Sequence, residues 1–307
     1  MTDPHLAQPH GARPPPPAAV PVTGRPTGLP TGAQAEPLTE PPPGPGGAPR
    51  VALVAGAARG IGAATVAALA TAGWRVMAVD RCADDPALPY PLGRRAELEK
   101  VAADAGPDVV IAEADTRDVA ALAAAVAETE RRWGGLDAAL AVAGVIAGGV
   151  PAWEVPVGQE QAVLDIDLGG VLNLARVAVP ALLRRPEPRH GRFLAVASTA
   201  ATRGLPMLAA YCAAKAGVTG FIRALAVELR GTGITANAVS PGSTATPILD
   251  QSARLYGLPS AKSFAPQQPL GRLLDPAEVA AVLAFLAGDG ASGMTGAVVP
   301  VDGGLAL

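Results

Sequence analysis

The chain has little of what metal sites, disulfide scaffolds and nucleic-acid surfaces need. Of its 307 residues, three are histidine, two are cysteine and 3% are aromatic. His5 and His10 fall in a proline-rich stretch at the start, so only His190 belongs to the part expected to fold. A histidine-based triad or a zinc cluster needs more ligands than this, and few aromatic rings leave few platforms for stacked bases. We therefore expect no metal site and no nucleic-acid partner.

Charge is also sparse and nearly balanced. Charged residues make up 17% of the chain and the formal net charge is −3, which argues against a strongly basic nucleic-acid binder and against a highly charged disordered protein. Cys82 and Cys212 are too few for a disulfide scaffold and fit a reducing compartment. The apolar stretch Ala138–Trp153 is too short and too rich in glycine to span a membrane, which takes about 20 residues. We expect a soluble, cytoplasmic protein with no membrane partner.

Proline divides the chain into two parts. Residues 1–49 hold 15 prolines and seven glycines, and such a stretch buries too little apolar surface to offset its chain entropy, so we predict a disordered tail. From residue 50 onward, short apolar runs alternate with longer helical patterns. This alternation predicts parallel strands joined by right-handed crossovers. Residues 50–307 are therefore predicted to form one doubly wound, Rossmann-type α/β domain, with a seven-stranded parallel sheet flanked by helices.

The predicted elements place the candidate residues. The strands are expected at Val51–Ala55, Trp74–Val79, Asp108–Ala114, Leu136–Ala143, Arg192–Ala197, Thr235–Ser240 and Ala297–Val301. The helices are expected at Ile61–Ala72, Arg95–Ala105, Val119–Arg132, Gln159–Leu183, Leu208–Leu229 and Pro276–Ala287. Ligands of open parallel sheets bind beyond the carboxyl ends of the strands, so the residues that follow each strand are the ones to read for function.

A glycine-rich turn joins the first strand to the first helix. The turn lies in the segment Ala55-Gly56-Ala57-Ala58-Arg59-Gly60-Ile61-Gly62. Glycines allow the backbone to approach a pyrophosphate closely, and the helix N-terminus offers unpaired N–H groups and the positive end of its dipole. Its place between strand and helix makes this turn the predicted dinucleotide site. The candidate binding residues are Gly56, Arg59, Gly60, Ile61 and Gly62.

Two carboxylates follow the next two strands. Asp80 ends the second strand, 18 residues after Gly62, where a carboxylate accepts hydrogen bonds from the adenosine ribose and repels a 2′-phosphate. Arg81 can offset part of that repulsion, so the pattern favours NAD over NADP without excluding NADP. Asp115, after the third strand, is a candidate for the adenine edge. A solvated loop acid at Asp80, and a cap at Asp115 for the helix that begins near Val119, are the structural alternatives.

A tyrosine and a lysine lie one helical turn apart at the start of the fifth predicted helix. Tyr211 and Lys215 are four residues apart and share a helix face. An ammonium group stabilises a nearby phenolate, so we expect the pKa of Tyr211 to fall toward the range useful for general acid–base catalysis. Ser198, at the end of the fifth strand, can offer its hydroxyl to a substrate oxygen. The structural alternative is a half-buried tyrosine with no catalytic role.

These features together resemble the short-chain dehydrogenase/reductase family over about residues 50–304. Further matching motifs are Asn237-Ala238-Val239-Ser240-Pro241-Gly242, Thr246-Pro247 and Val301-Asp302-Gly303-Gly304. The resemblance implies hydride transfer between NAD and an alcohol or carbonyl carbon. It implies that Tyr211 exchanges a proton with the substrate oxygen, Ser198 holds that oxygen and Lys215 also binds the nicotinamide ribose. It further implies cofactor contacts at Ala143, Gly144, Pro241, Gly242, Thr244 and Thr246.

The chain departs from the family pattern at three places. Ala55 stands where the glycine motif usually begins with threonine, and Ala141-Val142-Ala143-Gly144 replaces Asn-Asn-Ala-Gly. Asp167 stands where the family has the asparagine that helps to hold a water in the proton relay to the lysine. An aspartate can do the same, and its charge favours a protonated Lys215. A non-catalytic NAD-binding redox sensor would show such departures, although the presence of the serine, tyrosine and lysine argues against one.

An insertion follows the second strand. Asp80 and Asp115 are 35 residues apart, about ten more than we expect, and the excess is the proline-rich loop Cys82–Pro91. With Val145–Gly149 and Leu255–Leu258, this loop resembles the mycofactocin-coupled branch of the family. That resemblance implies a tightly held NAD whose electrons pass to mycofactocin, a peptide-derived redox carrier. We expect the loop to cover the adenosine and slow dissociation, and an ordinary NAD-exchanging dehydrogenase is the alternative.

The substrate lid and the subunit contacts are also implied by the resemblance. The family places a mobile lid at residues 248–270, where Leu249, Leu255, Leu258 and Phe264 predict an apolar substrate, such as a hydrophobic secondary alcohol or the corresponding ketone. Family members usually pair through their two long helices, here the predicted helices ending at Leu183 and Leu229. A homodimer or homotetramer is therefore expected.

Overall fold

Strands and helices alternate along residues 49–307, the part of the chain that the structure, a computed structural model, describes. The strands are β1 (Val51–Ala55), β2 (Arg75–Asp80), β3 (Val109–Glu113), β4 (Ala138–Ala141), β5 (Arg192–Val196), β6 (Thr235–Pro241) and β7 (Val298–Val301). The α-helices are α1 (Gly60–Thr71), α2 (Arg95–Ala105), α3 (Val119–Trp133), α4 (Val157–Leu164), α5 (Gly170–Leu183), α6 (Ala209–Glu228), α7 (Pro247–Leu255) and α8 (Pro276–Ala287). The predicted disordered tail falls on residues 1–48, outside the described residues, apart from Pro49.

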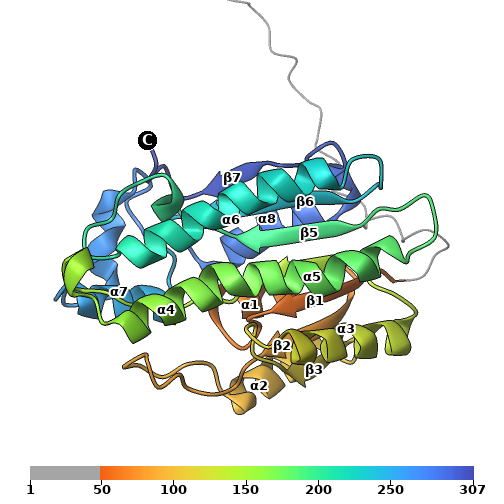
Figure 1. The fold of residues 1–307 in the computed structure, drawn as a ribbon, viewed down its shortest axis with the longest axis horizontal. Helices are drawn as coiled ribbons and strands as arrows, with labels where there is room; N and C mark the ends of the chain where they lie inside the picture. The colour runs from red at the N-terminus through yellow and green to blue at the C-terminus, as the bar shows by residue number, and fades with distance from the viewer. Residues whose placement is uncertain (1–48) are drawn as a thin grey trace, which may run out of the picture. The chain divides into compact units, whose positions relative to one another are not determined.

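The strands form one sheet in the order β3-β2-β1-β4-β5-β6-β7, and every neighbouring pair is parallel. Helices lie on both faces of this sheet (Figure 1). The predicted fold class, a doubly wound parallel sheet, is therefore confirmed. The chain crosses from one half of the sheet to the other between β3 and β4, so β1 and β4 are neighbours at the point where ligands of such sheets bind.

Apolar strand residues alternate between two core layers. Leu53 and Phe193 face α3, α5 and α6, where they pack in one cluster with Leu174. Val54 faces α1, α2 and α8 and packs in a second cluster with Leu283. The central strands β1, β4 and β5 are buried at every position, because helices cover both sides of the sheet. This double burial explains why these strands read as continuous apolar runs in the sequence.

The prediction of one uninterrupted α-helix at Gln159–Leu183 is wrong, because a π-helical turn interrupts it. The structure has α4, then a π-helical turn at Asp165–Gly169, then α5. A π turn admits one extra residue per turn and is often found at functional sites. Here it contains Asp167, which is fully buried. Apolar periodicity does not reveal such a turn, because helical pattern continues on both sides of it.

The segment expected to be a lid, residues 248–270, is mostly helical. Pro247 begins α7, and the Thr246 hydroxyl accepts a hydrogen bond from the Leu249 amide at 3.4 Å, so α7 starts with a capped turn. A 3₁₀ helix follows at Ala261–Gln267. The rings of Tyr256 and Phe264 meet edge to face, with centroids 6.0 Å apart. This segment is thus a packed pair of helical parts with an aromatic contact between them.

Two helical segments, Val157–Leu183 and Ala209–Glu228, are long and apolar enough to cross a membrane by composition. Both bury one side against the sheet, through residues such as Leu174 and Ile222. They are therefore core helices of the α/β domain on that side.

Candidate active site

One cavity of about 800 Å³ lies where the strands end. All the predicted cofactor-binding residues line it, from the glycine turn to Thr246, together with Ser198, Tyr211 and Lys215. Asp167 does not line it, and instead lies buried behind its wall. Residues after each of the seven strands line this cavity, as expected for an open parallel sheet.

Two glycines of the turn, Gly56 and Gly62, have no room for a side chain. A Cβ atom on Gly62 would overlap the carbonyl oxygen of Gly56, and one on Gly56 would overlap the backbone of Ala143. Gly56 and Gly60 also have φ angles of +92° and +58°, which favour glycine. Arg59 makes no side-chain cap at the start of α1, so the N–H groups of the first turn remain available to an anion. These features fit a dinucleotide pyrophosphate.

The loss of the usual threonine at Ala55 is compensated by backbone hydrogen bonds. The Ala55 carbonyl accepts from the amides of Val142 and Ala143, at 2.9 and 2.8 Å. These bonds tie the end of β1 to the segment after β4. The close approach of Gly56 to Ala143 therefore does not require a threonine hydroxyl.

Asp80 is held in place at the end of β2. Its Oδ2 accepts from the Ala58 amide at 3.0 Å, and its Oδ1 accepts from the Cys82 amide at 3.3 Å. Because Ala58 belongs to the glycine turn, the carboxylate is fixed relative to the pyrophosphate site. It lines the cavity with Arg81, so it is not merely a solvated loop acid. This geometry fits a ribose that donates its hydroxyl hydrogens.

Asp115 does not cap the helix that follows it. That cap is Asp118, whose Oδ1 accepts from the amides of Ala120 and Ala121. Asp115 lines the cavity and forms ion pairs with Arg81 and Arg117. The capping alternative is therefore excluded, and the side chain borders the cavity while the two arginines hold it.

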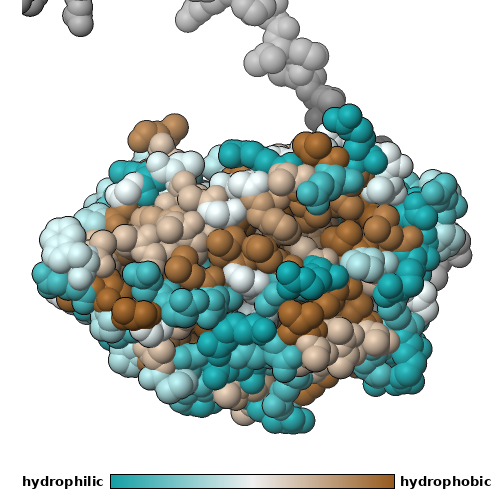
Figure 2. All heavy atoms as spheres, viewed as in Figure 1, coloured by the Kyte–Doolittle hydropathy of each residue, from teal (hydrophilic) through white to brown (hydrophobic). Residues whose placement is uncertain are grey.

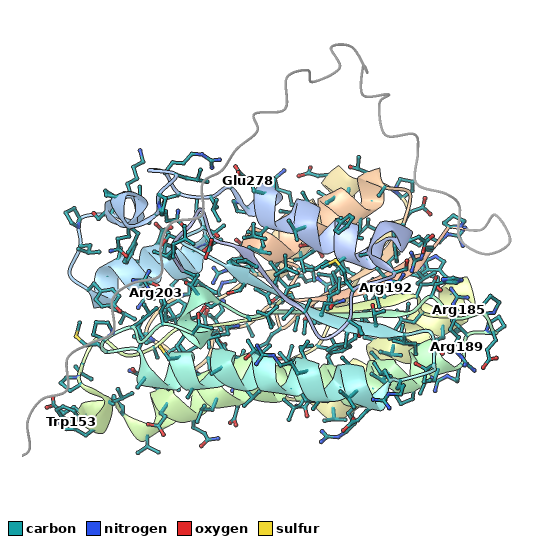
Figure 3. The ribbon with its side chains drawn as sticks, turned by 90° about the horizontal axis from the view of Figure 1, so that it is seen from above. Trp153, Arg185, Arg189, Arg192, Arg203 and Glu278 are labelled. Atoms are coloured by element: carbon teal, nitrogen blue, oxygen red, sulfur yellow. The ribbon has the colours of Figure 1, made fainter. Side chains whose placement is uncertain are left out.

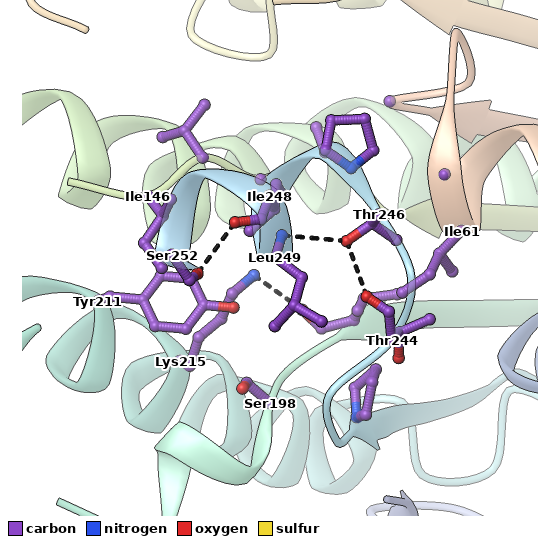
Figure 4. A pocket seen from close by; sticks show the side chains of 18 of the residues that line it. Ile61, Ile146, Ser198, Tyr211, Lys215, Thr244, Thr246, Ile248, Leu249 and Ser252 are labelled. Carbon is purple, nitrogen blue, oxygen red and sulfur yellow. Dashed lines mark hydrogen bonds between the residues drawn. The ribbon is translucent and has the colours of Figure 1, made fainter. Parts of the chain in front are cut away.

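The hydroxyl of Tyr211, the ammonium of Lys215 and the side chain of Ser198 converge on one part of the cavity (Figure 4). Lys215 Nζ lies 5.6 Å from the centre of the Tyr211 ring and donates to the Val196 carbonyl at 3.1 Å. Ser198 Oγ accepts from the Ala200 amide at 3.1 Å, which fixes the turn after β5. A tyrosine hydroxyl beside a serine and a lysine can exchange a proton with a substrate oxygen.

The expected fall in the pKa of Tyr211 is wrong in sign. The side chain keeps part of its surface open to the cavity, yet desolvation by the surrounding atoms raises its pKa. The Lys215 ammonium and the Ser198 hydroxyl lower the pKa, as predicted, but the Asp167 charge raises it again. The spacing of Tyr211 and Lys215 in the sequence predicts the nearby ammonium but not the burial of the tyrosine. It therefore reveals only one of the opposing effects on the pKa of Tyr211.

Asp167 lies on the far side of Lys215 from the cavity. Its Oδ1 accepts from the Val145 amide at 2.7 Å, and its Oδ2 lies 3.6 Å from Lys215 Nζ without a hydrogen-bond partner. Burial raises the pKa of Asp167 to about 6, against the lowering effects of Lys215 and the Val145 amide. The carboxylate thus faces the lysine, as the expected relay position would, and its second oxygen can still accept a proton.

The inserted loop Cys82–Pro91 reaches further than the adenosine. Ala83, beside Arg81, lines the cavity. Leu88 and Tyr90 are buried in a cluster with Ile146, and the Tyr90 hydroxyl accepts from the Ile146 amide at 2.8 Å. Arg59 of the glycine turn donates to the Pro91 carbonyl at 3.0 Å. The loop therefore runs from the end of β2 to the segment after β4, and is fastened at both.

Some residues that hold the cavity wall in place were not singled out from the sequence. Gln268 accepts from the Ser243 amide at 2.8 Å and donates to its carbonyl at 3.2 Å, which fixes the turn after Gly242. Tyr90 was not predicted. A usable signal was present, because the chain has only three tyrosines and this one lies in an unexpected insertion. Leu255 was expected at the substrate but packs against Gly149 instead.

The part of the cavity that is expected to receive the substrate is mostly apolar. Ile146, Ile248, Leu249, Leu258 and Phe264 line it. One cation, Arg203, lies in the same wall and donates to the carbonyl of Leu305, which also lines the cavity. Figure 3 shows Arg203 at the opposite end of the molecule from the group Arg185, Arg189 and Arg192.

Comparisons with known proteins agree with this geometry. A family model described as enoyl-(acyl carrier protein) reductase matches residues 56–306. The chain is 37% identical over 261 residues to cis-4-hydroxycyclohexanecarboxylate dehydrogenase of Sinomonas cyclohexanicum, which covers 84% of this chain and 96% of the relative.

Solved structures extend the likeness to three dimensions. Carveol dehydrogenase from Mycobacterium avium in complex with NAD superposes with a TM-score of 0.78 at 33% identity, covering 83% of this chain and 97% of that one. The 3-ketoacyl-(acyl-carrier-protein) reductase from Brucella melitensis complexed with NADH gives 0.74 at 30% identity, covering 84% and 98%. Relatives matched over nearly their whole length, on the same fold, show that the chain belongs to the short-chain dehydrogenase/reductase family.

Proposed function

We propose that the protein is an NAD-dependent oxidoreductase that interconverts an apolar secondary alcohol and its ketone. The observation that carries this proposal is the convergence of Ser198, Tyr211 and Lys215 on a cavity that also contains the glycine turn and Asp80. The first three groups can handle a proton at a substrate oxygen, and the others can hold a dinucleotide. NAD-bound and NADH-bound relatives of similar fold support the choice of cofactor.

Different residues of the cavity are assigned to different parts of the dinucleotide. The free N–H groups at the start of α1 bind the pyrophosphate, and Asp80 accepts from the adenosine ribose. Gly144 and Lys215 would hold the nicotinamide ribose, and the turn from Pro241 to Thr246 would hold the carboxamide. When bound, the nicotinamide ring supplies the hydride acceptor or donor.

The side chains handle the proton. In the reduction direction, Ser198 holds the substrate oxygen, and the Tyr211 hydroxyl donates its proton to that oxygen as the carbonyl carbon gains a hydride. Oxidation is the reverse, with the proton of the alcohol returning to the Tyr211 phenolate. The Lys215 ammonium stabilises the developing phenolate charge. Asp167 positions Lys215 and can help to hold a water of the proton relay, because its Oδ2 faces the ammonium and has no hydrogen-bond partner among the described residues.

The apolar wall favours a substrate of about the size of a substituted ring. Two of the relatives are named for cyclic compounds, cis-4-hydroxycyclohexanecarboxylate and carveol. Arg203 is paired with a backbone carbonyl and with no carboxylate in the described part of the chain. This cation favours, as a second candidate, a ring alcohol that carries a carboxylate.

The inserted loop favours a tightly held cofactor as a further candidate property. Its contacts at Arg59 and Ile146 fasten it on both sides of the dinucleotide-binding wall, so NAD release requires these contacts to open. An enzyme that does not release NADH needs an external electron acceptor, and mycofactocin is the carrier implied by the sequence resemblance. An ordinary NAD-exchanging dehydrogenase and a non-catalytic NAD-binding sensor are the alternatives.

The long helices offer a surface for self-association in the cytoplasm. Apolar side chains gather over α5 and α6 on the face shown in Figure 2. Val157, at the start of α4, is 81% exposed, and Val227, near the end of α6, is 62% exposed. Burial of such a surface stabilises an oligomer. The proposed assembly is a homodimer or homotetramer, and size-exclusion chromatography with light scattering tests it, since a monomer would contradict it.

One experiment separates the three functional possibilities. The absorbance of the reduced nicotinamide is recorded on purified protein with cyclohexanol, carveol and 4-hydroxycyclohexanecarboxylate, each with and without an artificial electron acceptor. The coupled enzyme gives bound reduced cofactor and multiple turnovers only with the acceptor. Free NADH without an acceptor indicates an ordinary dehydrogenase, and no reduction with a broadened panel of ring and chain alcohols indicates a sensor.

A further inference from the structure

An ion-pair cluster at the adenosine end joins the inserted loop to the segment after β3. Asp85, in the loop, is 4% exposed. Its Oδ2 lies 2.8 Å from Nη1 of Arg81 and 2.9 Å from Nη1 of Arg117. Asp115 pairs with the same two arginines, 3.2 Å from Arg81 Nε and 2.7 Å from Arg117 Nη2. Each guanidinium group is therefore held between two carboxylates.

Arg81 is the member of the cluster that borders the cofactor site. It follows Asp80 at the end of β2, and both residues line the cavity. In dinucleotide-binding folds an arginine near this position accommodates the 2′-phosphate of NADP. Here two of its nitrogens, Nη1 and Nε, already face carboxylates. Its positive charge is thus neutralised within the protein.

Asp85 remains an anion despite its burial. Burial acts to raise its pKa, but the Ala87 amide, Arg81 and Arg117 outweigh this effect and hold the pKa below its usual value. The Ala87 amide donates to Asp85 Oδ1 at 2.9 Å, which leaves Oδ2 to the two arginines. The carboxylate is therefore charged at neutral pH.

The balance of charge opposes a 2′-phosphate. The carboxylates of Asp85 and Asp115 pair with the guanidinium groups of Arg81 and Arg117, and Asp80, next to Arg81 in sequence, adds a third carboxylate at the cavity, so these five side chains carry one net negative charge. A phosphate monoester brings close to two further negative charges at neutral pH. Loss of the Asp85 charge would make the cluster neutral and free one nitrogen of Arg81.

We propose that Asp85, in the inserted loop, is a specificity-determining residue that makes the site prefer NAD to NADP by engaging Arg81 and Arg117. The proposal rests on the proposed dinucleotide site and on no particular substrate. It gives the inserted loop a role in choosing the cofactor, in addition to any role in retaining it.

The test compares dissociation constants of NAD⁺ and NADP⁺, measured by calorimetry after charcoal treatment to remove nucleotide from the purified protein. We expect Asp85→Asn to favour NADP⁺ over NAD⁺ by about tenfold relative to the wild type, because a freed guanidinium gains a charged acceptor. Asparagine keeps the acceptor for the Ala87 amide. The matched control is Asp84→Asn, which removes a carboxylate that pairs with Arg94 instead, and it should change the ratio by less than about twofold.

A double variant identifies the responsible arginine. Asp85→Asn combined with Arg81→Leu should return the ratio to within about threefold of the wild type. The proposal would be overturned if Asp85→Asn left the ratio of the two dissociation constants unchanged or weakened the binding of both nucleotides equally. It would also be overturned if the gain in NADP⁺ preference persisted in the double variant that lacks Arg81. If Asp85→Asn fails to fold, the more exposed Asp115→Asn should shift the ratio in the same direction, and a shift toward NAD⁺ would overturn it. Because the measurement uses no alcohol, absence of turnover would contradict only the proposed reaction.

Discussion

Asp167 and Lys215 face each other inside the protein, with 3.6 Å between Oδ2 of the carboxylate and Nζ of the ammonium and almost no exposed surface on either side chain. The carboxylate is fixed by the Val145 amide, and the ammonium by the Val196 carbonyl. The pair thus connects the segment after β4 to β5 behind the cavity. This position explains how a residue that does not line the cavity can still act on Tyr211, through the charge and position of the lysine.

Replacement of Asp167 by asparagine should preserve most of the activity. Asparagine keeps an oxygen for the Val145 amide and is the residue that the family resemblance implies at this position. We expect Asp167→Asn to change kcat by no more than about tenfold, which corresponds to about 1.4 kcal/mol in the barrier. Steady-state alcohol oxidation checks this. Complete loss of turnover in a folded variant would show that the carboxylate itself is required.

The same variant should change how stability depends on pH. The pKa of Asp167 is about 6 in the folded protein, above its usual value of 3.8. The protonated carboxyl group therefore favours folding below about pH 4, and this contribution is lost as the pH rises through 6. The loss amounts to about 3 kcal/mol. Relative to the wild type, Asp167→Asn should become more stable by up to this amount between pH 4 and pH 8. Parallel denaturant-unfolding curves across that range would contradict the raised pKa.

Tyr90→Phe should loosen the inserted loop. The variant removes the hydrogen bond from the Ile146 amide to the Tyr90 hydroxyl and leaves the ring packed. A net loss of about 1 kcal/mol predicts NAD dissociation about fivefold faster. Stopped-flow displacement of NAD measures the rate. The matched control is Tyr256→Phe, whose hydroxyl donates to the Pro206 carbonyl in the lid region. An equal change in both variants, or none in Tyr90→Phe, would show that the loop does not control release.

Gly62→Ala should disable the cofactor turn. Its Cβ would overlap the Gly56 carbonyl oxygen, so the turn must shift, and we expect unfolding to become easier by about 2 kcal/mol and NAD affinity to fall at least tenfold. Gly220→Ala is the matched control, because nothing lies within 4 Å of its Cβ position in α6. Alanine there should stabilise the helix by about 0.5–1 kcal/mol. Thermal unfolding and NAD titration of both variants check this, and unchanged NAD affinity in Gly62→Ala would contradict the assigned site.

The alternation of apolar runs and helical patterns was enough to predict the fold. Apolar strands separated by helices form a parallel sheet with helices on both faces, and the residues after the strands meet at one cavity because parallel strands end at the same edge. The pair Tyr211 and Lys215 was visible because a spacing of four fixes a shared helix face. Residue spacing in the sequence therefore predicted side-chain placement wherever that placement depends on a single helix or strand.

Features that depend on contacts between distant segments could not be read in this way. The pKa of Tyr211 depends on atoms packed around it from other elements, so its sign was missed. The π turn around Asp167 leaves the apolar pattern intact. Asp85 and Arg117 are 32 residues apart in sequence, and only the folded loop brings them together.

The exchange of a proton by Tyr211 is the central claim, and Tyr211→Phe tests it most directly. The variant removes the hydroxyl and keeps the ring, with Lys215 and Ser198 in place. NAD affinity and alcohol-dependent reduction of the nicotinamide are measured on the same preparation. The account predicts NAD affinity within about twofold of the wild type and a kcat lower by about a thousandfold. Retention of more than about a tenth of the wild-type kcat, with NAD still bound, would contradict it.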